Sequence, residues 1–310
     1  MLDNLSSGSR EALRRVTQLA NSDVAVSVGD VRSAEALDIA FKALAPDAVI
    51  HLAGLKSVSG SKDAPLEYYD HNVTGAIELV KAMQRHGCRH IVFSSSATVY
   101  GTAQSVPCDE THTRNPISPY GRTKCFVEDI LRDWTQATDG ASAVVLRYFN
   151  PVGAHPSGRI GEDLRGTPTN LMPRLTEVAS GRAKELYIFG DDYDTHDGTG
   201  ERDFIHVEDL ARAHLKAVAH CCTRTGFDDF NVGTGQGATV LGMVRAFEHS
   251  TGRSVPYKIR PRREGDVARS IADVGKAARV LGWRAQLGLE DMCRSAWRWQ
   301  DMTSETSKRL

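Results

Sequence analysis

The sequence predicts an α/β protein organised around a doubly wound parallel sheet. Three observations favour this class. Short runs of apolar, largely β-branched residues alternate with segments whose apolar residues have helical spacing. The runs are apolar at consecutive positions, as expected of strands covered by helices on both faces. Hydrophobic residues make up 41% of the 310 residues and charged residues 25%, a composition that supports a packed core.

The first half of the chain carries most of the alternation. The expected helices span 10–20, 34–45, 73–86 and 118–135. The expected strands span 23–28, 47–54, 90–95 and 143–149. Pro119 lies in the first turn of the last of these helices, where proline is favoured. Parallel sheets bind ligands at the carboxyl ends of their strands, so residues that follow these strands are candidates for a site.

The second half is less regular. Residues 151–173 are rich in Gly and Pro and are expected to form mainly loop. The expected helices span 171–180, 240–251, 274–281 and 289–301, and the expected strands 185–189 and 229–232.

Composition excludes several classes of function. With 38 basic and 39 acidic residues, the net charge of −1 gives no general attraction to nucleic acid or an anionic membrane. No apolar run is long enough to span a membrane, and the first residues do not resemble a signal peptide. The six cysteines are dispersed and form no C-x-x-C pair, which favours reduced thiols in the cytoplasm and no metal site.

Tyr120 and Lys124 give the strongest chemical signal. At i and i+4 they lie on one face of the helix expected at 118–135. A phenol has a pKa of about 10, and a nearby ammonium favours its charged form, which is a general base. Ser96 follows a predicted strand and can share the same substrate hydroxyl. A single Tyr–Lys pair is more often surface or core, and only its placement beside Ser96 favours catalysis.

Longer strings extend this signal. They include FSSSATVYG at 93–101, LRYFNPVGAHPSG at 146–158, and the segments 51–56, 65–70, 118–121, 170–173, 200–207 and 262–266. With these strings the chain resembles the UDP-glucose 4-epimerases (UDP-galactose 4-epimerases), a family of extended short-chain dehydrogenase/reductases. The resemblance covers residues 2 to about 300 and implies a Rossmann-like fold.

The resemblance implies an isomerase of nucleotide-sugar metabolism that interconverts UDP-galactose and UDP-glucose. NAD would stay tightly bound, and a transient 4-keto sugar would form and be reduced again. Tyr120 would take the proton from the sugar 4-hydroxyl with the help of Ser96, and Lys124 would hold ribose hydroxyls. Two alternatives remain: another NAD-dependent sugar-nucleotide enzyme of the same fold, or a catalytically impaired UDP-sugar-binding fragment. Dehydration needs an acid–base carboxylate pair, which Ala97 and Thr98 do not supply.

The resemblance also implies two sets of binding residues. The NAD set is Asp3, Asn4, Asp30, Val31, Leu52, Ala53, Gly54, Lys56, Asn72, Ser96, Tyr120, Lys124, Tyr148 and Phe149. The UDP-sugar set is Ser96, Tyr120, Asn150, Asn170, Tyr187, Ile188, Phe189, Arg202, Arg263, Asp266 and Ser270.

One position of the second set bears on specificity. Ser270 falls where the family limits the space around the sugar 2-substituent. A serine leaves more room there than a tyrosine, so some activity on UDP-N-acetylhexosamines is expected.

The resemblance divides the chain into two expected domains. Residues 1–150 would form a truncated NAD-binding domain, joined by a returning segment near 203–235, and residues 151–310 mainly the UDP-sugar domain. The first strand, glycine-rich turn and helix of such a domain are not seen before Asp3, through a misplaced start or genuine shortening. We therefore expect weak NAD binding and low stability, because that turn donates backbone hydrogen bonds to the pyrophosphate. A homodimer through the helices at 73–86 and 118–135 is also implied.

Overall fold

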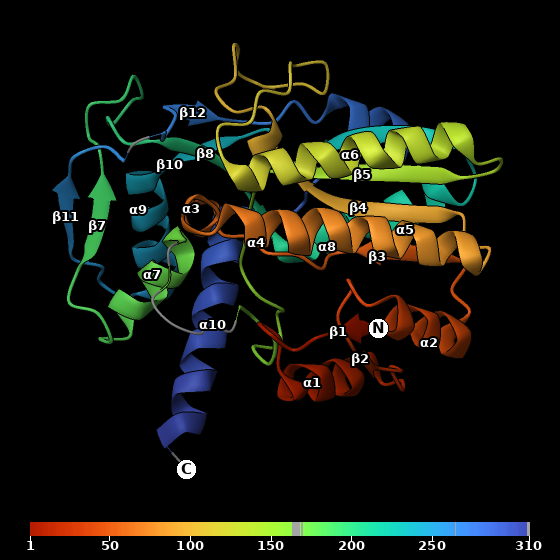
Figure 1. The fold of residues 1–310 in the computed structure, drawn as a ribbon. Coiled ribbons are helices and arrows are strands. Elements are labelled where there is room, and N and C mark those ends of the chain that lie inside the picture. The colour runs from red at the N-terminus through yellow and green to blue at the C-terminus, as the bar shows by residue number, and fades with distance from the viewer. Residues whose placement is uncertain (163–167, 169, 264, 309–310) are drawn as a thin grey trace.

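A computed structural model describes residues 1–162, 168, 170–263 and 265–308. A four-stranded parallel sheet forms its centre, in the strand order β3-β4-β5-β9 (Figure 1). Its strands are β3 (Ala48–His51), β4 (His90–Ser96), β5 (Ser142–Tyr148) and β9 (Gly226–Val232). Each neighbouring pair is parallel, so the carboxyl ends of all the strands lie at one edge.

Helices cover both faces of this sheet. On one face lie α2 (Ala34–Leu44), α5 (Gly75–Arg85) and α6 (Pro119–Ala137), and on the other lies α8 (Val207–Cys221). Ile91 and Phe93 of β4 pack under the first group, whereas Val92 packs towards α8. Successive strand side chains point to opposite faces, so the uninterrupted apolar run in β4 is explained by burial on both sides. The predicted parallel α/β class is confirmed.

The first residues form a smaller unit beside this sheet. β1 (Leu2–Asp3) and β2 (Ser27–Val28) pair in parallel as a separate two-stranded sheet, and α1 (Arg10–Ala20) connects them. Ser9 caps α1 by accepting a hydrogen bond of 3.0 Å from the backbone N–H of Ala12. The strand predicted at 23–28 is thus only two residues long.

A helical segment between β3 and α5 escaped the sequence prediction. It comprises α3 (Val58–Asp63), α4 (Pro65–Tyr69) and the π-helical turn η1 (Asp70–Thr74), which runs directly into α5. A short 3-10 turn, η2 (Ala97–Val99), follows β4.

Residues 203–235 return to the central sheet through β8 (Glu201–His206), α8 and β9. α8 was not predicted, because its buried face is built from Ala213, Ala217 and Cys221, whose small side chains give a weak hydrophobic pattern.

The remaining elements build a second layer with its own core. β8 pairs with β6 (Asn150–Val152), β10 (Gly237–Thr239) and β12 (Arg269–Ser270). β7 (Leu186–Phe189) pairs with β11 (Tyr257–Arg260). The helices are α7 (Leu171–Ala179), α9 (Val240–Thr251) and α10 (Leu289–Lys308), and η3 (Ala277–Leu281) is a π-helical turn where a helix over 274–281 was predicted. Within the described residues, no helix has the length and apolar character needed to cross a membrane.

Candidate active site

The carboxyl end of β4 meets the first turn of α6. Ser118 caps α6 by accepting a hydrogen bond of 3.1 Å from the backbone N–H of Gly121. A Cβ at Gly121 would lie 2.8 Å from the carbonyl oxygen of Thr98, so glycine allows this close approach of helix and turn. The approach brings Tyr120 close to Ser96, the last residue of β4, whose hydroxyl accepts hydrogen bonds from the N–H and Oγ1 of Thr98 at 3.2 and 3.0 Å.

Tyr120, Lys124 and Ser96, the expected catalytic residues, therefore form one group. The Nζ atom of Lys124 lies 5.6 Å from the centre of the Tyr120 ring. The same atom donates a hydrogen bond of 2.7 Å to the carbonyl oxygen of Ser94 and lies 4.8 Å from the centre of the Phe93 ring. The group lies at the carboxyl edge of the parallel sheet, where such folds bind ligands.

The acidity of Tyr120 differs from the expectation. We expected Lys124 to lower its pKa, but burial raises the pKa of Tyr120 to about 12, and the hydrogen bond with Ser96 opposes this only in part. The Lys124 ammonium does not offset this effect, because it faces the tyrosine ring and donates its hydrogen bond to a backbone carbonyl oxygen. The chain's own residues thus keep the phenol neutral at neutral pH.

Two buried residues that the sequence analysis did not single out lie close to Lys124. Burial lowers the pKa of Lys124 to about 8, and the negative charge of Glu128 acts against that effect. Burial, and to a smaller extent the Lys124 charge, lowers the pKa of His51 at the end of β3 to about 3. The spacing of four residues between Lys124 and Glu128 was the signal that could have indicated Glu128.

The turn after β3 depends on Gly54 and Asn72. Gly54 has a φ of 149°, and a Cβ there would lie 2.8 Å from Oδ1 of Asn72. This Oδ1 accepts a hydrogen bond of 2.8 Å from the N–H of Leu55, and Nδ2 donates to Leu55 O and to Thr123 Oγ1. The amide of Asn72, an expected cofactor residue, is thus occupied in holding this turn against α6.

The other expected NAD residues near β3 and β5 differ in exposure. Leu52, Ala53 and Gly54 are exposed at the carboxyl end of β3, and Lys56 forms a 2.7 Å ion pair with Glu162. The Tyr148 hydroxyl lies 2.6 Å from Nε2 of His214 in α8.

Phe149 is buried in a small core with Val99 and Tyr100. Its side chain therefore contributes to packing.

Asp3, Asn4 and Asp30 gather at the carboxyl ends of β1 and β2. Asp3 Oδ1 accepts a 2.7 Å hydrogen bond from the N–H of Leu5, and Asn4 Nδ2 donates to Asp30 Oδ2 at 3.1 Å. Hydrogen bonds from Arg32 hold the pKa of the Asp30 carboxyl well below its usual range. Carboxylates at this edge are suited to accept hydrogen bonds from ribose hydroxyls, so the donor and acceptor set fits the adenosine end of NAD.

Val31, the neighbour of Asp30, packs against the core under α2 and α5. A Cβ at Gly75 would lie 2.7 Å from its Cγ1.

Three expected UDP-sugar residues lie in the sheet around β8. Arg202 lies in β8, and Ser270 of β12 is its partner in the parallel register. Asn150 begins β6, which a single residue separates from the end of β5, and pairs with Phe204. The second sheet thus continues from the carboxyl edge that carries Ser96. Burial lowers the pKa of Arg202, whose Nη1 donates to the carbonyl oxygen of Glu201 at 2.9 Å.

The remaining UDP-sugar candidates lie around β7. The Arg263 guanidinium lies 3.7 Å from the centre of the Phe189 ring, and Tyr187 is exposed. Ile188 is only 1% exposed, and its side chain packs in the second core.

Two candidates outside β7 are exposed, Asn170 at the cap of α7 and Asp266 in the loop before β12. Glu264 of the string at 262–266 lies outside the described residues.

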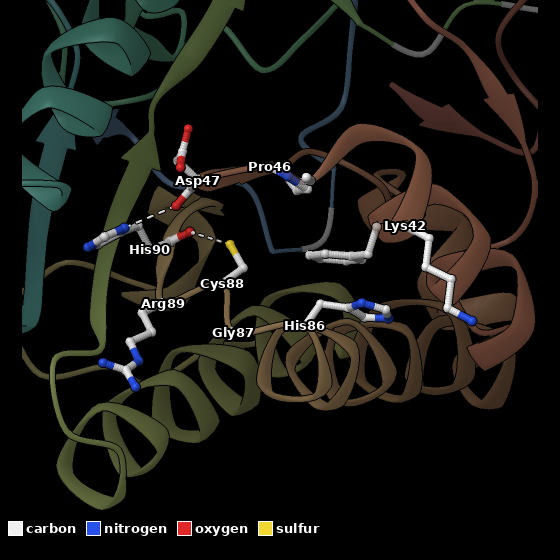
Figure 2. A pocket seen from close by; sticks show the side chains of 10 residues that line it. Lys42, Pro46, Asp47, His86, Gly87, Cys88, Arg89 and His90 are labelled. Carbon is white, nitrogen blue, oxygen red and sulfur yellow. Dashed lines mark hydrogen bonds between the residues drawn. The ribbon is translucent and has the colours of Figure 1, made fainter.

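A cavity of about 510 Å³ lies at the opposite, amino end of the central sheet (Figure 2). His86, Cys88 and His90 are among its lining residues. The Nδ1 atom of His90 is 3.0 Å from the carbonyl oxygen of Asp47, and the Cys88 thiol donates to the carbonyl oxygen of His90 (Figure 2). His86 Nε2 lies 2.9 Å from Oδ1 of Asp38. All three groups are therefore engaged within the protein at the edge away from Tyr120, so we assign the cavity no catalytic role.

The fold and this site define a class of enzyme that holds a nucleotide at the carboxyl edge of a parallel sheet. The model of the NAD dependent epimerase/dehydratase family matches residues 1–233, and the chain belongs to this family. The family and the fold expected from the sequence are thereby confirmed.

Within the family, the chain is similar to UDP-glucose 4-epimerases. The enzyme of Bacillus subtilis is 51% identical over 300 residues, which cover 97% of this chain and 88% of the relative. The crystal structure of the enzyme from Stenotrophomonas maltophila, with bound NAD and formylated UDP-arabinopyranose, has a TM-score of 0.96 at 45% identity and covers 98% of this chain and 91% of its own. The enzyme of Bifidobacterium longum in complex with NAD+ and UDP has a TM-score of 0.93 at 45% identity, with coverages of 98% and 90%.

Proposed function

We infer that this chain is an isomerase that interconverts UDP-galactose and UDP-glucose by inverting the configuration at C4 of the hexose. The observation that carries this inference is the meeting of Tyr120, Ser96 and Lys124 at the carboxyl edge of the sheet. A phenol, a hydroxyl and an ammonium in one group can bind a sugar hydroxyl and move its proton. The similarity to UDP-glucose 4-epimerases along nearly the whole chain supports the same reaction.

Each residue has a distinct part in this reaction. Tyr120 takes the proton of the 4-hydroxyl at its phenol oxygen and returns it in the reverse step, while Ser96 orients that hydroxyl. Lys124 would hold the nicotinamide ribose of NAD, and Asp3 and Asp30 the adenosine end. When bound, NAD supplies a hydride acceptor at C4 of its nicotinamide ring and a positive charge that favours the phenolate form of Tyr120. The transient product is a 4-keto sugar, which is reduced on its other face.

The bound diphosphate must hold the sugar nucleotide in the site while the 4-keto sugar rotates to present its other face. Arg202 and Arg263 are the candidates, because the planar guanidinium matches paired phosphate oxygens. Ser270 beside Arg202 leaves room around the 2-substituent, so we propose activity on UDP-N-acetylhexosamines as well.

The decisive experiment combines cofactor content with turnover. Purified protein is assayed for bound NAD by absorbance and fluorescence, and then for conversion of UDP-galactose. Bound NAD with turnover supports the isomerase. UDP binding without NAD or turnover would instead support the impaired fragment, and loss of water from the sugar would support a dehydratase.

We also propose a cytoplasmic homodimer. The six cysteines are free thiols, in keeping with a reducing compartment. Leu66 of α4 and Phe126 of α6 are 82% and 48% exposed, and the Phe126 ring packs on Tyr69. An apolar face of this kind is suited to a second copy of the chain.

Light scattering tests the dimer. Phe126→Glu is expected to yield monomers, whereas Ile39→Glu, at an exposed position of α2, is expected to leave the dimer intact. A monomeric wild-type protein would contradict this proposal.

A further inference from the structure

A buried ion pair lies directly behind the candidate active site. Arg147 of β5 donates to Glu128 of α6 through Nε and Nη2, at 3.1 and 2.7 Å from the two carboxylate oxygens. Both side chains are almost completely buried, at 1% and 0% exposure. A two-point pair of this geometry fixes the orientation of both groups.

The surrounding groups complete this pair. Arg147 Nη2 also contacts Asp229 at 2.8 Å, and its Nη1 donates to the Tyr100 hydroxyl at 3.0 Å. Arg114 lies 3.3 Å from Glu128 Oε2 at the open side. Buried charges are tolerated when they are paired and hydrogen-bonded in this way, and removing one partner leaves the other uncompensated.

Glu128 also connects α6 to the end of β4. The Ser95 hydroxyl donates to Glu128 Oε1 at 2.5 Å, and the neighbouring Ser94 carbonyl oxygen accepts from Lys124. Ser96, the next residue, contacts Tyr120. Tyr120, Lys124 and Glu128 follow one another at four-residue spacing on one face of α6. Three consecutive residues of β4, Ser94 to Ser96, therefore each contact a different turn of this helix.

We propose that Glu128, held by Arg147, is a positioning residue for the reaction, which fixes α6 on β4 through Ser95 and supplies the negative charge that keeps Lys124 an ammonium. The positioning role rests on the proposed function. The effect of the Glu128 charge on Lys124 can be tested without turnover. Nothing in the contacts of Glu128 requires it to touch substrate or cofactor.

The other ionisable groups around Lys124 do not provide this charge. His51 from β3 is held neutral by burial, and Tyr120 from α6 keeps its proton. Tyr148 from β5 and Tyr68 from α4 are near enough to Tyr120 to interact with it electrostatically, and burial raises the pKa of Tyr148. Glu128 is the group whose charge acts against burial to raise the pKa of Lys124.

The test follows the protonation of Lys124 directly. The ¹³Cε chemical shift of Lys124 is titrated in protein labelled with [¹³Cε]lysine and assigned by its loss in Lys124→Met. Glu128→Gln is expected to lower the midpoint by about one pH unit, because the nearest negative charge is gone. Asp129→Asn is the matched control: it removes the next carboxylate of the same helix, half exposed and paired with Arg114, and is expected to leave the midpoint unchanged.

Turnover gives a second readout. In Glu128→Gln the alkaline limb of kcat against pH is expected to move down with the Lys124 midpoint, while KM for UDP-galactose stays within about twofold, because Arg202 and Arg263, the candidates for binding the diphosphate, lie outside the central sheet. An unchanged Lys124 midpoint in folded Glu128→Gln overturns the proposal. A wild-type protein without turnover would overturn the proposed function only, since the midpoints still decide the role of Glu128.

Two further variants keep the proposal testable if Glu128→Gln does not fold. Glu128→Gln/Arg147→Met removes both charges and is expected to show a midpoint between those of Glu128→Gln and wild type, because loss of the Arg147 positive charge partly offsets loss of the carboxylate. Glu128→Asp keeps the charge but retracts it from Ser95, and is expected to keep the wild-type midpoint with a kcat lowered about tenfold or more. A Glu128→Asp protein with wild-type kcat would contradict the positioning role.

Discussion

The ammonium of Lys124 donates a hydrogen bond of 2.7 Å to the carbonyl oxygen of Ser94. This acceptor belongs to the backbone of β4 and does not titrate in the physiological range. The contact between α6 and β4 therefore fixes the position of Lys124 before any ligand binds. The same contact places Tyr120 one turn earlier, beside Ser96. The catalytic group is therefore pre-organised by the packing of one helix on one strand.

Removal of the phenol oxygen tests the general base. Tyr120→Phe is expected to lower kcat for UDP-galactose by about 10²- to 10⁴-fold, the usual contribution of a positioned acid–base group. Circular dichroism is expected to show an intact fold, because the ring still fills its site. Tyr257→Phe serves as the control at an exposed tyrosine of β11 that has no part in proton transfer. Equal loss in both variants would contradict the assignment of Tyr120.

The sugar pocket is tested at Ser270. Ser270→Tyr is expected to reduce kcat/KM for UDP-N-acetylgalactosamine by about tenfold or more, since a bulky ring beside Arg202 takes the space of an N-acetyl group. Turnover of UDP-galactose is expected to stay within about threefold. Ser254→Tyr, at an exposed serine before β11, controls for the added ring. A wild-type protein and a Ser270→Tyr protein that are equally inactive on N-acetylated sugars would argue against this role.

His51 is expected to shape the acid side of the stability curve. Its pKa is lowered by burial to about 3 in the folded protein, whereas an unfolded histidine titrates near 6.5. Between these values the unfolded state binds the extra proton, so the free energy of unfolding falls as the pH falls through this window.

Urea titrations at pH 7 and pH 4.5 measure this effect. His51→Asn is expected to lose less stability than wild type between the two pH values, and His249→Asn, at an exposed histidine of α9, is expected to follow wild type. Parallel loss in all three proteins would show that other groups control acid unfolding.

The turn after β3 provides a test of backbone strain. Gly54→Ala is expected to lower the free energy of unfolding by about 1–3 kcal/mol, because φ is positive and the new Cβ would meet Oδ1 of Asn72 at 2.8 Å. Gly87→Ala isolates the conformational part, since its φ is also positive but no atom lies within 4 Å of its Cβ position. Equal effects of the two substitutions in urea unfolding would show that the Asn72 contact is not a constraint.

Local signals predicted many of the elements. The helix expected at 240–251 has these bounds as α9, because Thr239 caps its first turn and Gly252 ends it with a left-handed φ of 65°. α1 likewise has its predicted bounds, with Ser9 as its cap. α8 was missed because small alanines form its buried face, and β2 is shorter than its apolar run because only two of its residues find a partner strand.

The sequence by itself determined the parallel α/β class and the identity of the catalytic candidates, because helical spacing, strand patterns and the Tyr120–Lys124 interval are local properties of the chain. Tertiary structure alone decided the charge state around them. The raised pKa of Tyr120, the lowered pKa of Lys124 and the buried Glu128–Arg147 pair all depend on desolvation and on contacts between residues far apart in sequence. Those energies arise only when α6 packs on β4 and β5. The four-residue spacing of Lys124 and Glu128 indicates that they are neighbours on one helix, but not that they are buried.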